Sequence, residues 1–207
     1  ALPYFNAGRE TSARVSWKEG NSPVSEADHA ANDALSAILR GARPGYQWVS
    51  EETADALDRL SASHVFVVDP IDGTRAFISG KLQWSVSVAL VVQGEPALGV
   101  IHAPALGVTY VARRGGGATR NGQPIRHSER ARLDRASAAG PKPTLESLET
   151  AAGVTLDHAP KVPSLALRLA LAAEGRVDLA LASTGAHDWD VAAADVILRE
   201  AGGVLLD

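Results

Sequence analysis

The sequence predicts a mixed fold in which an α+β region is followed by an α/β region. Residues 84–120 hold β-rich runs separated by glycine or proline, which is typical of an antiparallel meander. Residues after 134 alternate helical and strand patterns, which is typical of βα units. Apolar residues make up 45% of the 207, enough for a buried core. We therefore expect an N-terminal domain over 1–133 and a C-terminal domain over 134–207.

The first elements place acidic residues at strand ends. A helix is predicted from residue 25, because apolar residues recur at helical spacing until Gly41 and Pro44 stop it. Strands are predicted over 46–50 and 64–69. Acids stand at the carboxyl end of both strands, which makes these ends candidates for a site.

The remaining elements follow in chain order. We expect the meander strands over 84–92, 97–102, 108–112 and 117–120, closed by the turn pair Asn121-Gly122. We expect helices over 144–152, 164–173 and 190–201, and strands over 177–182 and 204–206. No internal repeat is apparent in this order.

Composition narrows the chemistry. The formal charge of −4 gives no general attraction to nucleic acid or to an anionic membrane. No apolar run reaches membrane length and the first residues lack a secretory pattern, so we expect a cytoplasmic protein. Cysteine is absent, which excludes disulfides, thiolate zinc sites and cysteine nucleophiles.

The hexapeptide Asp69-Pro70-Ile71-Asp72-Gly73-Thr74 carries the strongest chemical signal. The strand delivers Asp69 to its end, Pro70 breaks the ladder, and Gly73-Thr74 can start a helix with free N–H groups. Carboxylates suit Mg²⁺, and helix N–H groups suit phosphate. The motif therefore predicts a metal-bridged phosphate ester; the alternative is an Asp-rich turn with Asp72 as a helix cap.

Two further acidic positions are weaker taken singly. Glu51-Glu52 could add a third carboxylate or be two solvated acids. Asp190 could be a ligand or only the N-cap of the last helix. Four acids at strand ends and helix starts are unfavourable together unless a cation binds among them, which favours a metal site.

Competing signatures fail on spacing. Gly80-Lys81 does not complete a G-x-x-x-x-G-K-[ST] phosphate loop, and the run Gly115–Gly117 lacks the dinucleotide-binding pattern. No G-x-S-x-G or H-E-x-x-H occurs, which disfavours serine hydrolases and zinc proteases. Haloacid-dehalogenase phosphatases place one residue between their two aspartates, whereas two separate Asp69 from Asp72.

Taken together, these segments resemble the inositol monophosphatase superfamily of metal-dependent, lithium-sensitive phosphatases. The resemblance rests on Lys18, Ser22–Asp28, Glu51-Glu52, Asp69–Thr74, Asn121-Gly122, Trp189–Ala194 and Glu200–Gly203. It implies a five-layer αβαβα sandwich of the sugar-phosphatase type. In that family a longer N-terminal helix and a further C-terminal stretch are usual, so we expect either that an end is missing from this sequence or that the protein is short for the family.

The resemblance also implies a ligand set. Glu51, Asp69 and the carbonyl of Ile71 would hold one Mg²⁺, and Asp69, Asp72 and Asp190 a second. A third, weaker ion would contact Glu51. Mn²⁺ would substitute for Mg²⁺, and Li⁺ would inhibit.

Catalytic roles follow from the same resemblance. Thr74, paired with Asp28, and Glu51 would position and activate a water for in-line attack. The N–H groups of Gly73 and Thr74 would receive the phosphate. The substrate-contacting set would be Asp72, Gly73, Thr74 and Asp190.

The substrate is predicted less directly. Inositol monophosphatases carry a glutamate where this chain has Ser183. Several segments of the sequence look more like bacterial 3′(2′),5′-bisphosphate nucleotidases of the CysQ type. Inositol-1-monophosphatase, histidinol-phosphatase and a non-enzymatic regulatory protein of the same fold stay open. We expect a small phosphorylated substrate as partner, with no membrane and no nucleic acid required, and leave a homodimer open.

A second substrate phosphate would need a cation away from the metals. The sequence offers Arg75 and an arginine-rich stretch for this role. That stretch contains Arg113, Arg114, Arg120, Arg126, Arg130, Arg132 and Arg135. Its alternatives are a solvated hairpin and helix, or a docking face for a macromolecule.

Overall fold

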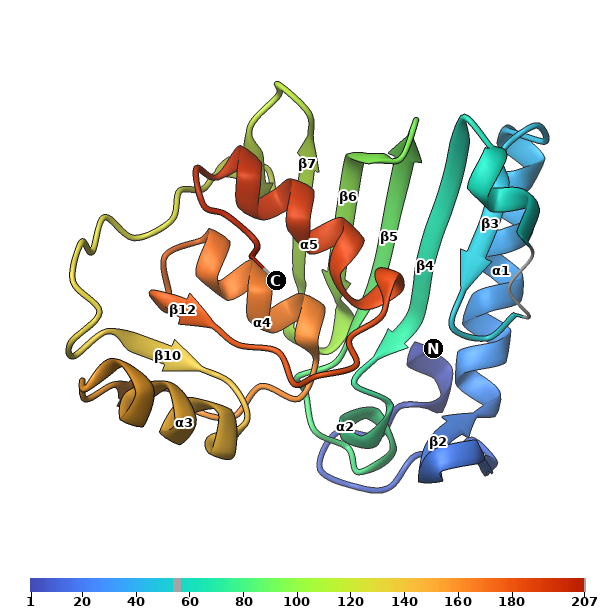
Figure 1. Ribbon diagram of the computed structural model, residues 1–207. Coiled ribbons are helices and arrows are strands. Elements are labelled where there is room, and N and C mark those ends of the chain that lie inside the picture. Colours follow the sequence, from blue (N-terminus) through green and yellow to red (C-terminus); the bar gives the residue numbers. More distant parts are fainter. Residues whose placement is uncertain (54–56, 207) are drawn as a thin grey trace.

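The computed structural model describes residues 1–53 and 57–206, arranged in alternating helical and sheet layers (Figure 1). Helix α1 (Glu26–Ala42) covers one face of a large sheet, and α4 (Leu165–Ala173) and α5 (Asp188–Glu200) cover the other. A small sheet lies beyond α4, and α3 (Lys142–Ala152) packs outside it. This order is the αβαβα sandwich predicted from the sequence. No helix in the described ranges is long and apolar enough to cross a bilayer.

The large sheet has seven strands in the order β3-β4-β5-β6-β7-β8-β9. Their bounds are β3 Gln47–Ser50, β4 His64–Asp72, β5 Ser85–Val92, β6 Glu95–Ala103, β7 Val108–Arg113, β8 Ala118–Arg120 and β9 Gln123–Pro124. Strands β3 and β4 are parallel, and every later pair is antiparallel, which confirms the meander. Asn121 (φ 49°) and Gly122 (φ 78°) form the predicted turn, because both adopt the positive φ that a tight hairpin needs.

The small sheet is parallel and has three strands. Its order is β11 (Asp157–His158), β10 (Ser137–Ala139) and β12 (Leu179–Ala180). A separate hairpin, β1 (Val15–Lys18) with β2 (Ser22–Ser25), precedes α1. The domain boundary at 133/134 stays a prediction, since α4 and α5 lie between the two sheets and share one core with the larger.

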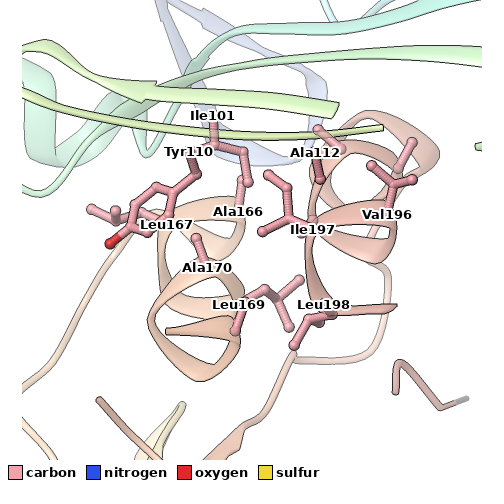
Figure 2. Close-up of a cluster of buried hydrophobic side chains, with 14 of the residues drawn as sticks. Ile101, Tyr110, Ala112, Ala166, Leu167, Leu169, Ala170, Val196, Ile197 and Leu198 are labelled. Atoms are coloured by element: carbon pink, nitrogen blue, oxygen red, sulfur yellow. The ribbon is translucent and has the colours of Figure 1, made fainter. Parts of the chain in front are cut away.

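The main core fills the space between the large sheet and helices α4 and α5 (Figure 2). Ile101 and Tyr110 project from the strands, Leu167 from α4 and Ile197 from α5, all fully or nearly fully buried. Gly99 of β6 lets α5 approach closely, since a Cβ there would lie 2.4 Å from the Ala193 carbonyl oxygen. This packing fixes where α5 begins relative to the sheet.

A second core supports the short helix α2 (Thr74–Ile78). Phe77 and Trp84 are fully buried and meet edge to face at 5.0 Å, and Phe5 packs on both. Aromatic pairs of this kind add stability beyond their buried area. The segment that follows Asp72 is therefore held firmly against the N-terminal residues.

Several boundaries differ from the prediction. Strand β4 does not end at Asp69 but continues to Asp72, because Pro70 falls in a bulge where no ladder hydrogen bond is needed. Helix α5 begins at Asp188, two residues earlier than predicted. Residues 204–206 are not a strand; Val204 and Leu206 are largely exposed and no described strand pairs with them.

Candidate active site

A cavity of about 750 Å³ opens where five segments of the described chain meet. The β1–β2 hairpin and the end of β3 form one side, and the β4–α2 turn forms the floor. The start of α5 and the segment before α4 form the other side. Its walls carry four carboxylates and four Lys or Arg side chains.

Three of the carboxylates converge in this cavity. Asp69, Asp72 and Asp190 each place one oxygen so that all three oxygens lie within 4.8 Å of one another. Residues three apart on a regular strand face opposite sides, but the bulge sets Pro70 and Ile71 against a single residue of β5. The bulge therefore turns Asp69 and Asp72 to the same side.

Asp190 reaches the cluster from the third position of α5 and is not the N-cap. Its Oδ2 accepts the His187 N–H at 2.7 Å, which caps the helix reciprocally. That interaction fixes the carboxylate over the end of β4. The alternative that Asp190 is the N-cap is therefore wrong. Asp190 caps the helix from its third position, and its carboxylate still faces the cavity.

Burial and like charge act together on these acids. Burial raises the pKa of Asp69 well above its ordinary value, and the charges of Asp72, Glu51 and Asp190 raise it further. Burial raises the pKa of Asp72 to about 6, against hydrogen bonds from Ser164, Leu165 and Ala166 that lower it. Burial likewise raises the pKa of Asp190.

The start of α4 holds Asp72 in place. The Leu165 N–H donates to Oδ1 at 3.0 Å, and the Ala166 N–H and Ser164 hydroxyl donate to Oδ2 at 2.7 and 2.5 Å. Ser85 bonds to Ser164 at 2.9 Å. Asp72 therefore joins α4 to β4 while a lone pair of Oδ1 stays available to a ligand.

Glu51 also lines the cavity, but it lies outside the group formed by the three aspartates. Its Oε1 lies 3.2 Å from Lys18 Nζ, which also bonds Glu52 at 2.7 Å. Burial opposes the charge on Lys18, but hydrogen bonds and the charges of Glu52 and Glu51 raise its pKa on balance. Glu52 is held by this ion pair with its side chain nearly buried.

Asp28 and Thr74 meet as the sequence predicts. Asp28 is the third residue of α1, where its Oδ2 accepts the Ser25 N–H and hydroxyl at 2.8 and 2.6 Å. Its Oδ1 accepts from Thr74 Oγ1 at 3.2 Å, and the Ile71 carbonyl lies 3.0 Å from the same hydroxyl. One hydroxyl has one proton, so Thr74 donates to only one of them at a time.

Gly73 is required by its conformation and by its surroundings. Its φ of 91° lies in the left-handed region, and a Cβ there would come within 3.2 Å of the Ser164 backbone. This glycine lets the β4–α2 turn pack on the start of α4.

Some cavity residues were not predicted. Lys81, Lys161 and His187 line the cavity and belong to no motif with a known chemical role. Ser164 is fully buried and does not line the cavity, but its hydroxyl bonds Asp72. The only signal for Ser164 was its place before an apolar helical run, which is typical of an N-cap. None of the seven arginines between 113 and 135 lines the cavity as described. Three of them form ion pairs elsewhere: Arg120 with Glu174, Arg130 with Asp178 and Arg135 with Asp157.

The residues fit a divalent cation. Asp69 is 2% exposed, and within the described ranges its carboxylate accepts one hydrogen bond, from the Ile71 N–H at 2.9 Å. Buried carboxylates are normally paired or coordinate a metal. Two buried carboxylates and the half-buried carboxylate of Asp190 face one another and supply the hard oxygen donors that Mg²⁺ prefers.

Known proteins share this architecture. A family model described as "Inositol monophosphatase family" matches residues 4–207. The chain is 36% identical to the inositol-1-monophosphatase of Mesorhizobium japonicum, covering 97% of this chain and 77% of the relative. It is 35% identical to the 3′(2′),5′-bisphosphate nucleotidase CysQ of Aggregatibacter actinomycetemcomitans, covering 96% and 77%. The structure of the extragenic suppressor protein SuhB from Bartonella henselae matches with a TM-score of 0.84 at 33% identity, covering 93% and 76%.

Sequence, fold and acid cluster agree, and the expectation drawn from the motifs is confirmed. The relatives are named for different activities, so they do not choose a substrate. The chain belongs to the inositol monophosphatase family, whose members are metal-dependent phosphatases.

Proposed function

We propose that this cavity hydrolyses a phosphate monoester with two or three Mg²⁺ ions. Asp69, Asp72 and Asp190 would hold one ion, and Asp69, Glu51 and the Ile71 carbonyl another, with a weaker third ion at Glu51. When bound, the ions neutralise charge on the phosphoryl group and lower the pKa of a water. The convergence of three carboxylates within 4.8 Å, two of them buried and that of Asp190 half-buried, is the observation that carries this proposal.

The chain's own residues position the reactants. Thr74 Oγ1 accepts a hydrogen bond from the attacking water while it donates its own hydrogen bond to Asp28 Oδ1, which lies 3.2 Å away. The Glu51 carboxylate accepts the second hydrogen bond of that water. The N–H groups of Gly73 and Thr74 donate to the phosphate oxygens at the start of α2, where the helix leaves them unpaired.

A phosphorylated substrate suits the charges of the loaded cavity. Four carboxylates and four cationic side chains line it, and the Glu52 carboxylate bonded to Lys18 adds a further negative charge. Two divalent ions would add four positive charges, and each phosphate monoester brings about −1.5 to −2 at neutral pH. The loaded site therefore carries an excess of positive charge that phosphate groups can neutralise, and the case for a second phosphate rests on Arg75.

Arg75 is the cation best placed for the second phosphate. It lines the cavity, donates to the Asn21 carbonyl at 2.5 Å, and lies 5.5 Å from the ring centre of Trp17. A guanidinium held in this way can donate two hydrogen bonds to one phosphate. We propose a 3′(2′),5′-bisphosphate nucleotide, such as 3′-phosphoadenosine 5′-phosphate, as the substrate.

Phosphate release with Mg²⁺ tests this assignment. We expect kcat/KM for 3′-phosphoadenosine 5′-phosphate to exceed that for inositol 1-phosphate, and Arg75→Ala to lower the ratio about tenfold. Arg132→Ala is the matched control, because Arg132 is an exposed arginine that does not line the cavity. An equal or greater kcat/KM on inositol 1-phosphate or histidinol phosphate would instead support one of the monophosphatase alternatives. It would leave the roles of the carboxylates intact.

The non-enzymatic alternative is less well supported, because a binding protein has no need of the converging carboxylates. Family membership supports a small phosphorylated substrate. A homodimer and a cytoplasmic location stay predictions.

A further inference from the structure

Two aromatic rings stack on each other at the N-terminal end of α5 and line the cavity. His187 and Trp189 lie with ring centres 4.6 Å apart and planes 17° from parallel, and both line the cavity. His187 is exposed and Trp189 is half-buried. The inner ring is thus anchored in the protein while the outer ring meets the solvent of the cavity.

His187 takes part in the capping of α5, but capping does not account for the stacked ring faces. The His187 backbone N–H donates to Asp190, and the Asp190 N–H donates to the His187 carbonyl at 3.0 Å and, in the capping box, to the His187 side chain. The Trp189 carbonyl accepts from Ser87 Oγ at 3.3 Å. A ring nitrogen accepts a hydrogen bond in the plane of the imidazole, so capping leaves unused the ring face that is turned away from Trp189.

The position relative to the carboxylates is suited to a leaving group. The stack is held one and three residues before Asp190, on the wall that rises from the acid cluster. Lys161 also lines this cavity and adds a positive charge to it. A group attached to the phosphate would extend from the carboxylates along this wall.

We propose that His187, backed by Trp189, stacks against a planar heteroaromatic ring of the leaving group. A nucleobase and an imidazole share this chemistry, while a sugar or a cyclic polyol lacks the flat π-face that stacking requires. The inference rests on the proposed phosphatase function and adds the class of leaving group. It does not depend on Arg75 or on the number of phosphates.

Four substrates distinguish the effect of an aromatic ring on kcat/KM from the effect of the number of phosphates. Two carry a ring, namely 3′-phosphoadenosine 5′-phosphate and histidinol phosphate. Two lack one, namely fructose 1,6-bisphosphate and inositol 1-phosphate. Each pair contains one bisphosphate and one monophosphate, so the ratio of kcat/KM at equal phosphate number reports the ring alone.

We expect His187→Ala to lower the ratio of ring-bearing to ring-free substrates about tenfold, chiefly through KM. His187→Phe keeps a flat ring and should restore most of the ratio. His64→Ala is the matched control: His64 stacks on Tyr46 at 4.5 Å and 21°, outside the cavity. It should leave all four values as in the parent enzyme.

Three outcomes overturn the inference. They are an unchanged ratio in His187→Ala, an equal fall for all four substrates, and a His187→Phe variant as poor as His187→Ala. If 3′-phosphoadenosine 5′-phosphate is a poor substrate for the parent enzyme, the nucleotide assignment fails by itself. The histidinol phosphate to inositol 1-phosphate ratio then decides whether His187 stacks.

Discussion

Replacing Asp69 by Asn should stabilise the metal-free protein and abolish its metal-dependent activity. Asp69 is buried, and its charge faces those of Asp72 and Asp190. Asparagine keeps a side-chain oxygen that can accept the Ile71 N–H, now bonded at 2.9 Å. The substitution therefore removes charge repulsion with little change in shape.

The magnitude follows from the geometry. Two unit charges 4.8 Å apart repel by about 3 kcal/mol at an effective dielectric constant of about 20. Proton uptake limits the effect, because protonating a carboxyl of ordinary pKa 3.8 at pH 7 takes only about 4 kcal/mol. We expect a gain of roughly 2–4 kcal/mol in the free energy of unfolding at pH 7. That corresponds to about 9 °C in Tm for a chain of this size.

The gain should depend on pH with a definite sign. An acid whose pKa is higher in the folded than in the unfolded protein loses stability as pH rises between the two values. For Asp72 these values are about 6 and 3.8, and Asp69 is shifted in the same direction. The difference between Asp69→Asn and the parent should be small near pH 4 and larger at pH 7.

Thermal unfolding in EDTA and in Mg²⁺ measures these effects. Mg²⁺ at about 100 times its dissociation constant should add about 2.7 kcal/mol to the parent protein and little to the variant. Asp58→Asn is the control, since Asp58 is exposed and outside the cavity. A variant that is not stabilised in EDTA, a gain of equal size at pH 4 and pH 7, or equal Mg²⁺ stabilisation of variant and parent would refute the reasoning.

Three further predictions concern the supports of the site and its ions. Gly99→Ala should lower the free energy of unfolding by roughly 2–3 kcal/mol in urea titration, because the new Cβ would lie 2.4 Å from the Ala193 oxygen; a neutral result would mean that α5 can shift without loss. Ser164→Ala should lower it by about 1–2 kcal/mol, since the hydroxyl caps α4 through Leu167 and bonds Asp72; an unchanged midpoint would show that the cap adds nothing. Li⁺ should inhibit phosphate release in competition with Mg²⁺, as is typical of the family, and insensitivity across a wide Li⁺ range would contradict the proposed ion sites.

The local elements could be predicted because their signals are local. The helix after Ser25, the meander and its Asn121-Gly122 turn each follow from a periodicity or a turn pair within a few residues. The β1–β2 hairpin, β9, β10 and β11 were missed, and only Leu179–Ala180 of the strand predicted over 177–182 is paired, because short strands are defined by the partner that they pair with. The strand predicted over 204–206 failed for the same reason.

The sequence alone identified Asp69, Asp72 and Asp190 as candidate partners, because strand ends and helix starts place acids in characteristic positions. Only the tertiary structure decided that they meet. A one-residue bulge in β4 turns Asp69 and Asp72 to one side, and the packing of α5 on Gly99 sets Asp190 above them. The sequence could not exclude a phosphate-binding role for the seven arginines between 113 and 135. It also did not reveal that His187 stacks on Trp189. Distances between segments far apart in the chain depend on how whole elements pack, and no local pattern encodes that.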